Sequence, residues 1–360
     1  MTAEYRLDIH TSDGVKVAEV TDYLDLAYSK RVNAPGLLQF ILLGDHRVIG
    51  ELEHDGQVIV YRRNATLGLP WTADFWGLLR YQRRYFTDHA LYEARAPGLL
   101  SLLGRRYVAW PAGTANRSEF TNVAGETLMK TLVDYNAGAG ATEANGRVRD
   151  GVISGIIVQA DTGQGNTISK GCAWQNLLET LQDLAGIAGG DFDLIKVGPA
   201  TWEFRFYLGQ RGTDRTAELL FTLERGNMAE PEYTYDRLAE ATVAIGAGQG
   251  EGADREVVVR TGPDYASDND IEVFVDARGN ETVAGVISSA DARLEKTRAR
   301  EQFSFRVVQT PGCAYGVHYQ SGDLVRAQYG PVNVVQKIVG VNIRFDENGM
   351  EQIDVEMETV

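Results

Sequence analysis

The stretch 339–357 reads VGVNIRFDENGMEQIDVEM and carries the clearest β pattern in the chain. Apolar residues stand at alternate positions on both sides of a turn: Val339, Val341, Ile343 and Phe345 before it, and Ile353, Val355 and Met357 after it. Such alternation is typical of strands with one buried face. The pair Asn348-Gly349 favours a tight turn between them. The sequence therefore predicts a long β-hairpin.

Upstream of this hairpin, the chain from residue 217 onward is predicted to be β structure interrupted by one helix. Four strand candidates precede the helix: 219–223, 241–245, 256–260 and 272–275. The helix is expected over 288–302, because Ser288 and Asp291 have the spacing of a capping box. Its apolar face is thin, chiefly Ala290 and Leu294, so we expect it to bridge modules rather than to lie in a core.

The first hundred residues show the same period of two. Predicted strands start with Tyr5, Leu7 and Ile9 and continue at 15–17, 23–28, 38–42, 58–61 and 76–81. A short apolar helix at 99–103, stopped by Gly104, follows them. Several short strands at this spacing are typical of a barrel or a sandwich.

Between the two β regions lies a segment with helical periodicity. Small polar residues at 111–118 suggest a linker, and a first helix is predicted over 123–135. A second helix has a stripe at offsets 0, 3, 4, 7, 10 and 11, formed by Trp174, Leu177, Leu178, Leu181, Leu184 and Ala185. Strands are predicted at 152–158 and in a hairpin of 192–195 with 202–206. We interpret 111–216 as a mixed α/β module.

Composition limits the function classes. At roughly 150 residues per domain, 360 residues predict two or three domains. The 35 basic and 50 acidic residues give a net charge of −15, which argues against a surface that grips nucleic acid or anionic lipid over much of its area. A basic patch confined to a small part of the surface is compatible with this net charge. The sequence contains neither an apolar run of membrane-spanning length nor a signal-peptide core, so we expect a soluble protein made in a cytoplasm.

The two cysteines, Cys172 and Cys313, have no second cysteine or histidine at ligand spacing. We expect free buried thiols, with a disulfide as the alternative.

The glycine run 246–252 resembles a dinucleotide-binding loop only in composition. The residues after it, at 256–260, are β-branched and predict a strand, whereas a nucleotide loop opens a helix. The segment 151–155 lacks the context of a nucleophilic serine turn. The five histidines do not form a zinc-binding spacing, and we interpret them as ordinary polar residues: His10, His46, His54, His89 and His318.

Carboxylates are numerous enough to leave a glycosidase pair open. The nearest clusters are Asp22 with Asp25, Glu230 with Glu232, and Asp268 with Asp270, and acidic surface is the simpler interpretation. The segment 346–349 lacks the rest of a calcium loop. We assign no catalytic, cofactor-binding or metal-binding residue, and expect no cofactor and no enzymatic activity.

The order of elements resembles the bacteriophage tail baseplate hub family. The resemblance lies in the segments 310–325 and 340–355, and in the early segments 36–43, 75–77 and 92–106. It implies an α+β, mainly β fold with two tube-like β-barrel domains, an α/β insert and a linking helix. Four parts are expected: 1–110 as the first β-barrel hub domain, 111–216 as a mixed α/β domain, 217–302 as a β segment with linker helix, and 303–360 as strands completing the second β-barrel.

The resemblance implies a structural protein of the virion. Three copies would form a ring at the tail tip, assembled in the host cytoplasm, that joins the six-fold tail tube to a central fibre or spike. The expected partners are two further copies, a distal tail or tail tube protein, a tape measure protein, a tail fibre or spike, and genomic DNA in transit. Acidic residues facing the channel would let DNA slide without binding.

Two alternatives stay open at this point. A tail-associated carbohydrate-binding or hydrolytic protein would use paired carboxylates or stacked aromatic residues, for which the chain offers Trp71, Trp76, Trp110, Trp174 and Trp202. The hub of a contractile injection or secretion machine is the other, because that machinery uses related hubs.

Overall fold

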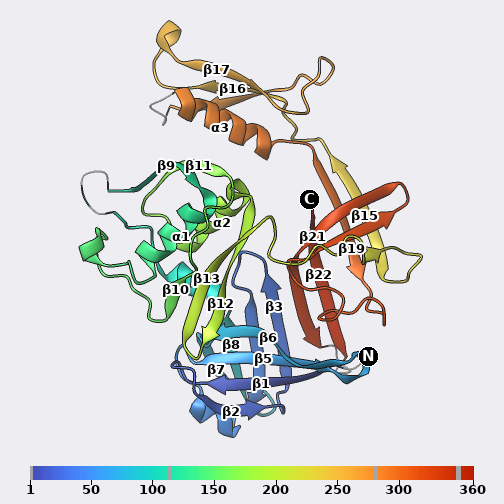
Figure 1. Cartoon of the computed structure of the whole chain (residues 1–360). Helices are drawn as coiled ribbons and strands as arrows, with labels where there is room; N and C mark the ends of the chain where they lie inside the picture. Colours follow the sequence, from blue (N-terminus) through green and yellow to red (C-terminus); the bar gives the residue numbers. More distant parts are fainter. Residues whose placement is uncertain (1–2, 112, 114–115, 279–282, 346–349) are drawn as a thin grey trace. The chain divides into compact units, whose positions relative to one another are not determined.

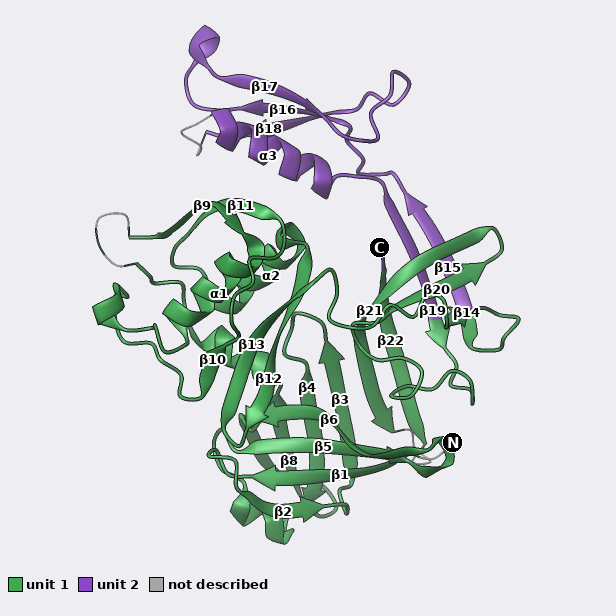
Figure 2. Cartoon of the chain, in the orientation of Figure 1, with its two compact units in different colours: residues 1–229, 306–358, 360 green, residues 230–305, 359 purple. Residues whose placement is uncertain are grey.

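The computed structural model describes residues 3–111, 113, 116–278, 283–345 and 350–360. Contacts divide the chain into two compact units (Figure 2). Unit 1 contains residues 1–229, 306–358 and 360, and unit 2 contains residues 230–305 and 359. Unit 1 is therefore built from both the early and the late parts of the chain (Figure 1).

One sheet of unit 1 has four strands in the order β2-β1-β5-β6. Their bounds are β1 (Glu4–His10), β2 (Lys16–Val20), β5 (Gln57–Asn64) and β6 (Leu69–Leu78). Tyr5, Leu7 and Ile9 are buried, which confirms the predicted inward face of the first strand. The predicted strand at 76–81 is divided, since Leu78 ends β6 and Tyr81 begins β7.

The larger sheet of unit 1 joins strands from both parts of the chain. Its order is β14-β20-β21-β3-β4-β8-β7, with β22 paired to β21. The bounds are β3 (Asp25–Arg31), β4 (Leu37–Leu43), β7 (Tyr81–Phe86), β8 (Ala90–Pro97), β14 (Leu220–Phe221), β20 (Leu324–Tyr329), β21 (Val332–Phe345) and β22 (Glu351–Thr359). β21 and β22 confirm the strands of the predicted hairpin, while its Asn348-Gly349 turn lies outside the described residues.

β21 is 14 residues long and pairs with two strands that are far apart in sequence. Its first half pairs with β20 through residues 332–337, and its second half pairs with β3 from Gly340, opposite Arg31, to Ile343, opposite Tyr28. Alternating apolar residues along β21 therefore reach the cores beside both strands. The chain is α+β and mainly β.

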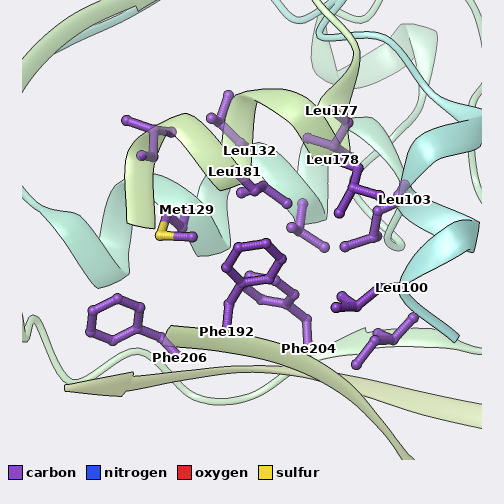
Figure 3. Close-up of a cluster of buried hydrophobic side chains, with 14 of the residues drawn as sticks. Leu100, Leu103, Met129, Leu132, Leu177, Leu178, Leu181, Phe192, Phe204 and Phe206 are labelled. Atoms are coloured by element: carbon purple, nitrogen blue, oxygen red, sulfur yellow. The ribbon is translucent and has the colours of Figure 1, made fainter. Parts of the chain in front are cut away.

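The middle of unit 1 contains two helices packed on a small sheet (Figure 3). The elements are the short 3-10 helix η3 (Leu99–Arg105), β9 (Ser118–Ala124), α1 (Gly125–Asn136), β10 (Ile156–Val158), β11 (Thr167–Cys172), α2 (Leu177–Ala188), β12 (Gly190–Gly198) and β13 (Thr201–Leu208). Leu132, Leu181, Phe192 and Phe204 are fully or almost fully buried between the helices and the β12-β13 hairpin. The predicted helices and hairpin are confirmed.

The predicted start of the second helix is wrong. Trp174 lies outside α2, has a positive φ of 58° and is half exposed. Asn176 is the N-cap instead, because its side chain accepts hydrogen bonds from the backbone N–H groups of Leu178 and Glu179. The helix continues through Gly186 and ends at Gly189, which adopts the left-handed conformation. The start of α2 is therefore set by the capping side chain of Asn176 and not by Trp174, although Trp174 has the spacing of the apolar stripe.

Two further sheets lie wholly or mostly in unit 2. β15 (Met228–Asp236) pairs with β19 (Arg300–Val307), and a second sheet has the order β17-β16-β18. The latter consists of β16 (Val243–Ala247), β17 (Val257–Thr261) and β18 (Glu272–Asp276), with α3 (Val283–Lys296) on one face. The core between α3 and the sheet is small and centres on Ala244, Ala290 and Leu294.

The predicted capping box at Ser288 is wrong. Ser288 lies inside α3, and its hydroxyl donates to the backbone oxygen of Ala284. Val286, Ala290 and Leu294 recur every four residues and are buried, so the helix extends upstream of the serine. It also ends earlier than predicted, because residues 300–302 belong to β19.

Candidate functional site

A cluster of buried and partly buried polar side chains lies where the early and late strands of unit 1 meet. Its members, called the junction cluster below, are Tyr5, Tyr28, Lys30, Arg62, Asp74, Tyr315 and Glu351. They come from β1, β3, β5, β6, the loop before β20 and β22.

Arg62 and Glu351 form the core of the junction cluster. The Arg62 side chain is 3% exposed and that of Glu351 is 8% exposed. The guanidinium donates from Nε to Oε1 of Glu351 at 2.7 Å and from Nη2 to Oε2 at 2.9 Å. Nη1 donates to the backbone oxygen of Tyr315 at 3.0 Å, and the Tyr5 hydroxyl also donates to Glu351. This bidentate pair fixes β22 against β5.

Asp74 on β6 is the second centre. Its carboxylate accepts hydrogen bonds from the hydroxyls of Tyr28, at 2.5 Å, and Tyr315, at 2.9 Å, and from Lys30 Nζ at 2.7 Å. Burial alone would raise the pKa of Asp74, but the charge of Lys30 and these donors hold it below its usual value. Asp74 is therefore an ionised acceptor rather than a general acid.

The tyrosines of the cluster stay protonated. Burial, and then the neighbouring carboxylates, raise the pKa of Tyr5, Tyr28 and Tyr315 well above the ordinary value. Each phenol therefore remains a hydrogen-bond donor at neutral pH. The chemistry of the junction cluster is structural, since every charged member is paired with a donor or acceptor of another strand.

A cavity of about 350 Å³ adjoins the junction cluster. It is lined by Lys30, Arg31, Ala34, Pro35, Asp74, Phe75, Trp76, Gly98, Leu99, Leu100, Asp193, Leu194, Ile195, Lys196 and Arg211. Two carboxylates meet here, but Asp74 is held by Lys30, and Asp193 is paired with Arg211. Burial lowers the pKa of Lys196, which donates to Gln57 and to the Pro199 backbone oxygen.

The predicted carboxylate clusters lie elsewhere. Asp22 accepts from His46 Nε2 at 3.1 Å, and this hydrogen bond lowers its pKa. Glu230 and Glu232 lie on β15, and Asp268 and Asp270 are in the segment between β17 and β18. Within the described ranges, no group of three or more His, Cys, Asp or Glu side chains is placed to hold a metal ion.

The histidines have local structural roles. His46 is the N-cap of a short 3-10 helix, 47–51, and accepts from the N–H of Val48. His318 Nδ1 accepts from the N–H of Ala314, and His10 Nδ1 contacts the backbone oxygen of Gly14. These contacts lie within turns, as the simpler interpretation predicted.

The glycine run 246–252 leads from β16 through a single 3-10 turn, 252–254, into β17. β16 and β17 pair antiparallel, so the run connects two strands and opens no helix, as its sequence predicted.

Cys172 and Cys313 are both free and buried, which confirms the prediction of free thiols. Burial raises the pKa of Cys313 to about 12, so this thiol is unreactive at neutral pH.

The five tryptophans have different surroundings. The ring of Trp71 lies under the guanidinium groups of Arg6 and Arg63, at 5.1 and 5.0 Å from the ring centroid. Trp110 stacks on Tyr135 with ring centroids 4.3 Å apart. Trp202 belongs to the buried core, Trp76 packs against this core and lines the cavity, and Trp174 is exposed. They do not form a stacked carbohydrate platform.

The junction cluster was missed at the sequence level, although a signal existed. Arg62 continues the inward face of β5 after Val58 and Val60, and Glu351 has the same parity in β22 as Ile353. A charged residue at an inward position requires a buried partner of opposite charge. The partner is 289 positions away, so sequence spacing could not identify it.

Solved structures with this fold include phage tail proteins and a component of a secretion system. A tail protein from Neisseria meningitidis is 11% identical, with 99% of this chain and 97% of that chain covered and a TM-score of 0.58. The prophage tail protein gp18 from Listeria monocytogenes is 14% identical, with 98% and 94% covered and a TM-score of 0.55. An E. coli component of the type VI secretion system is 10% identical, with 98% and 76% covered and a TM-score of 0.50. The chain thus has the fold of phage tail proteins.

The sequence identifies the family within this class. The chain belongs to the siphovirus ReqiPepy6 Gp37-like protein family, whose model matches residues 6–357. This match makes it a component of a phage virion and confirms the resemblance to phage tail proteins. No curated protein matches the chain in sequence. No helix among the described residues is both long and apolar enough to cross a membrane.

Proposed function

We propose that this protein is a structural baseplate hub at the tail tip of a bacteriophage. Three copies form a ring that joins the six-fold tail tube to a central fibre or spike and leaves a channel for DNA. The observation that carries the proposal is the match of nearly the whole chain, both to the family model and to tail proteins of similar length. We propose no enzymatic activity, because the buried carboxylates of unit 1 are used in structural pairs.

The proposed ring needs two tube-like β domains in each chain. We propose the four-part division at residues 110, 216 and 302 for this purpose, with residues 1–110 forming one β-barrel and residues 303–360 completing the other. Strand β21 pairs with both β20 and β3, so the strands of the two proposed domains are joined in one sheet. Six such domains in a trimer would meet the six-fold tube, with a distal tail or tail tube protein and the tape measure protein as neighbours.

Light scattering tests the trimer. The purified protein is expected to have a mass of three times 39.6 kDa at micromolar concentration. A mass of one chain over the whole concentration range would contradict the proposed ring. A complex with the neighbouring tube protein, at a ratio of three hub chains to six tube chains, would support a three-fold ring that binds the six-fold tube.

Acidic residues of the channel wall would keep DNA moving. Unit 2 holds 16 acidic and eight basic residues, so more than half of the chain's net charge of −15 lies in about a fifth of its length. We propose that part of this acidic excess faces the channel, since like charge prevents phosphate binding. A trimer structure whose channel wall is mainly arginine would contradict this.

The hub of a contractile injection or secretion machine is the second candidate. The likeness over 98% of the chain to a type VI secretion component favours it over a carbohydrate hydrolase. Gene neighbourhood separates the two hub roles: adjacent tape measure and distal tail genes support the phage hub, and effector genes support the secretion hub. Release of sugar from host polysaccharide by the purified protein would instead support the hydrolase.

A further inference from the structure

Strand β7 is exposed on both of its faces. It ends the eight-stranded sheet and pairs only with β8 among the described strands. Tyr81 is 40% exposed and Phe86 is 75% exposed. The Arg83 side chain is 54% exposed and lies 3.7 Å from the carboxylate of Glu93 on β8. Arg84 is also exposed. Aromatic and arginine side chains dominate the energetics of protein interfaces.

A second unpartnered surface lies on unit 2. In the sheet β17-β16-β18, Val259 is opposite Ile245 on one side, and Phe274 is opposite Ile245 on the other, so the three form one row. Val259 is 62% exposed, and Phe274 is 59% exposed. α3 covers the opposite face, where Ala244 is buried. These three residues, together with Val257 and Glu272, are called the open sheet face below.

The charge around the open sheet face indicates the chemistry of its partner. Unit 2 is strongly acidic, and Glu272 lies on the face itself, two residues before Phe274. The guanidinium of Arg255 lies 5.7 Å from the centroid of the Phe274 ring and also pairs with Asp276. The face therefore already binds one arginine by an aromatic and an ionic contact. A fitting partner has apolar side chains and further arginines.

Strand β7 has this composition, with two arginines, two tyrosines and a phenylalanine in six residues. We propose that β7 of one copy docks on the open sheet face of unit 2 of a second copy. The inference rests on the proposed trimer and specifies one of its contacts. Because the two surfaces differ, the contact runs head to tail, and a head-to-tail contact generates a closed ring where the rotation between copies closes.

Contacts between identical surfaces are unfavourable here. Two antiparallel β7 strands would place Arg83 and Arg84 opposite each other, and like charges directly across a strand pair are destabilising. Two open sheet faces would bring together the acidic surroundings of Glu272. Charge complementarity thus selects the contact between different surfaces.

The first experiment reverses the charge of β7. R83E/R84E is expected to lose the trimer at concentrations where the wild type is trimeric, with at least a tenfold weaker association. R149E/R225E is the control, because it changes the net charge equally at two exposed arginines outside both surfaces. Circular dichroism melting of each variant verifies that the chain is folded. A trimeric, folded R83E/R84E protein would overturn the inference while leaving the hub proposal intact.

The second experiment is disulfide trapping with F86C/V259C. Both positions are exposed, and the native cysteines are buried. Under mild oxidation, covalent species of two and three chains are expected on a non-reducing gel, and F86C alone gives no trimer. A disulfide within a single chain, or no disulfide in a protein that is trimeric by light scattering, would overturn the inference. A wild type that is monomeric throughout would contradict the proposed function itself.

Discussion

The ion pair between Arg62 and Glu351 connects β5 with β22, two strands that are far apart in sequence. Both groups are nearly inaccessible to solvent, and the guanidinium uses all three nitrogens on Glu351 and the Tyr315 backbone. Burying two charges costs desolvation free energy, so the pair as a whole adds little to the stability of the fold. Removing one partner is strongly destabilising, because the other charge is then buried and unpaired. The pair is therefore a test of whether β22 is correctly docked on β5.

Replacing Glu351 by glutamine should destabilise unit 1 strongly. E351Q leaves Arg62 buried without a negative partner, so we expect a loss of about 3–5 kcal/mol in the free energy of unfolding. E356Q is the matched control on the same strand, because Glu356 is 53% exposed and pairs with Arg31 at the surface. Its expected loss is below about 1 kcal/mol. Urea denaturation measures both, and equal losses would contradict the role of burial.

The buried tyrosines predict destabilisation at alkaline pH. The pKa values of Tyr5, Tyr28 and Tyr315 are raised in the folded protein, whereas unfolded tyrosines ionise near pH 10. Below that pH the phenols contribute fully, and above it the unfolded chain releases protons that the folded chain keeps. These three tyrosines should therefore lower stability by about 4 kcal/mol per pH unit above pH 10, at about 1.36 kcal/mol each. The raised pKa values of Tyr319 and Cys313 add to this fall.

Denaturant unfolding between pH 9 and 11 measures this slope. In Y28F one phenol is removed, so the slope should decrease by about 1.4 kcal/mol per pH unit. A slope that is unchanged in Y28F would show that other groups cause the alkaline loss.

Sequence patterns predict single residues well only where the contact is local. The alternation of Leu7 and Ile9 predicted their burial correctly, because period two follows from strand geometry alone. Arg62 lies on the same kind of inward position, but the reason for its burial is a carboxylate contributed by β22. The junction cluster depends on the pairing of strands that are far apart in sequence, and the periodicity of apolar residues carries no information about which strands pair.

At the scale of elements, helix starts are decided by caps. Trp174 has the spacing of the α2 stripe, yet the helix begins after Asn176, whose side chain accepts from two backbone N–H groups and donates to the Gly104 backbone oxygen. Ser288 has a capping-box sequence and lies in the second turn of α3. Spacing predicts which face of a helix is apolar, and the first hydrogen bonds decide where it starts.

Two alanine substitutions test these starts. N176A should lower stability by about 1 kcal/mol, because the N–H groups of Leu178 and Glu179 lose their acceptor. S288A should change it by less than about 0.5 kcal/mol, since the serine is exposed and merely donates back to Ala284 within the helix. Thermal or urea unfolding measures both. A larger loss for S288A than for N176A would contradict the assigned cap.

Strand β15 and the start of strand β19 were missed in the sequence analysis. β15 has the sequence MAEPEYTYD, whose exposed polar residues resemble a loop. Residues 300–302 of β19 were assigned to the end of a helix, while the rest of the strand lies in the part predicted as strands; Phe303 is buried and Phe305 has the same parity. Both strands exist because each supplies the other's backbone hydrogen bonds, and this mutual pairing leaves little trace in either sequence.

At the scale of the whole molecule, the two units differ in the size of their cores. The α/β core of unit 1 contains five phenylalanines and tryptophans among its many buried residues, whereas α3 of unit 2 packs through alanines and Leu294. Little apolar area is buried in unit 2, so its contribution to the driving force for folding is small. The cooperative unit with the lower stability is therefore unit 2.

Hydrogen exchange should separate the two units. Amides of β16 and α3 are expected to exchange at least tenfold faster than those of α2 and β13 at neutral pH, because unit 2 opens without global unfolding. L294A should accelerate exchange in unit 2 further and leave α2 unchanged, with L181A in unit 1 as the comparison. Equal exchange in both units, or an effect of L294A on α2, would show that they unfold together.

The long strand β21 also has a consequence for the order of folding during synthesis. β3 is made early, but the strand that completes its free edge, and the carboxylate that neutralises Arg62, are contributed by residues 340–351. Until the ribosome has released these residues, the nascent chain carries an open strand edge and an unpaired arginine on the inner side of its first sheets. Non-local pairing of this kind folds slowly. The half-made protein therefore depends on strands that are synthesised long after β3. Ribosome stalling before residue 351 should leave a nascent chain that is prone to aggregate.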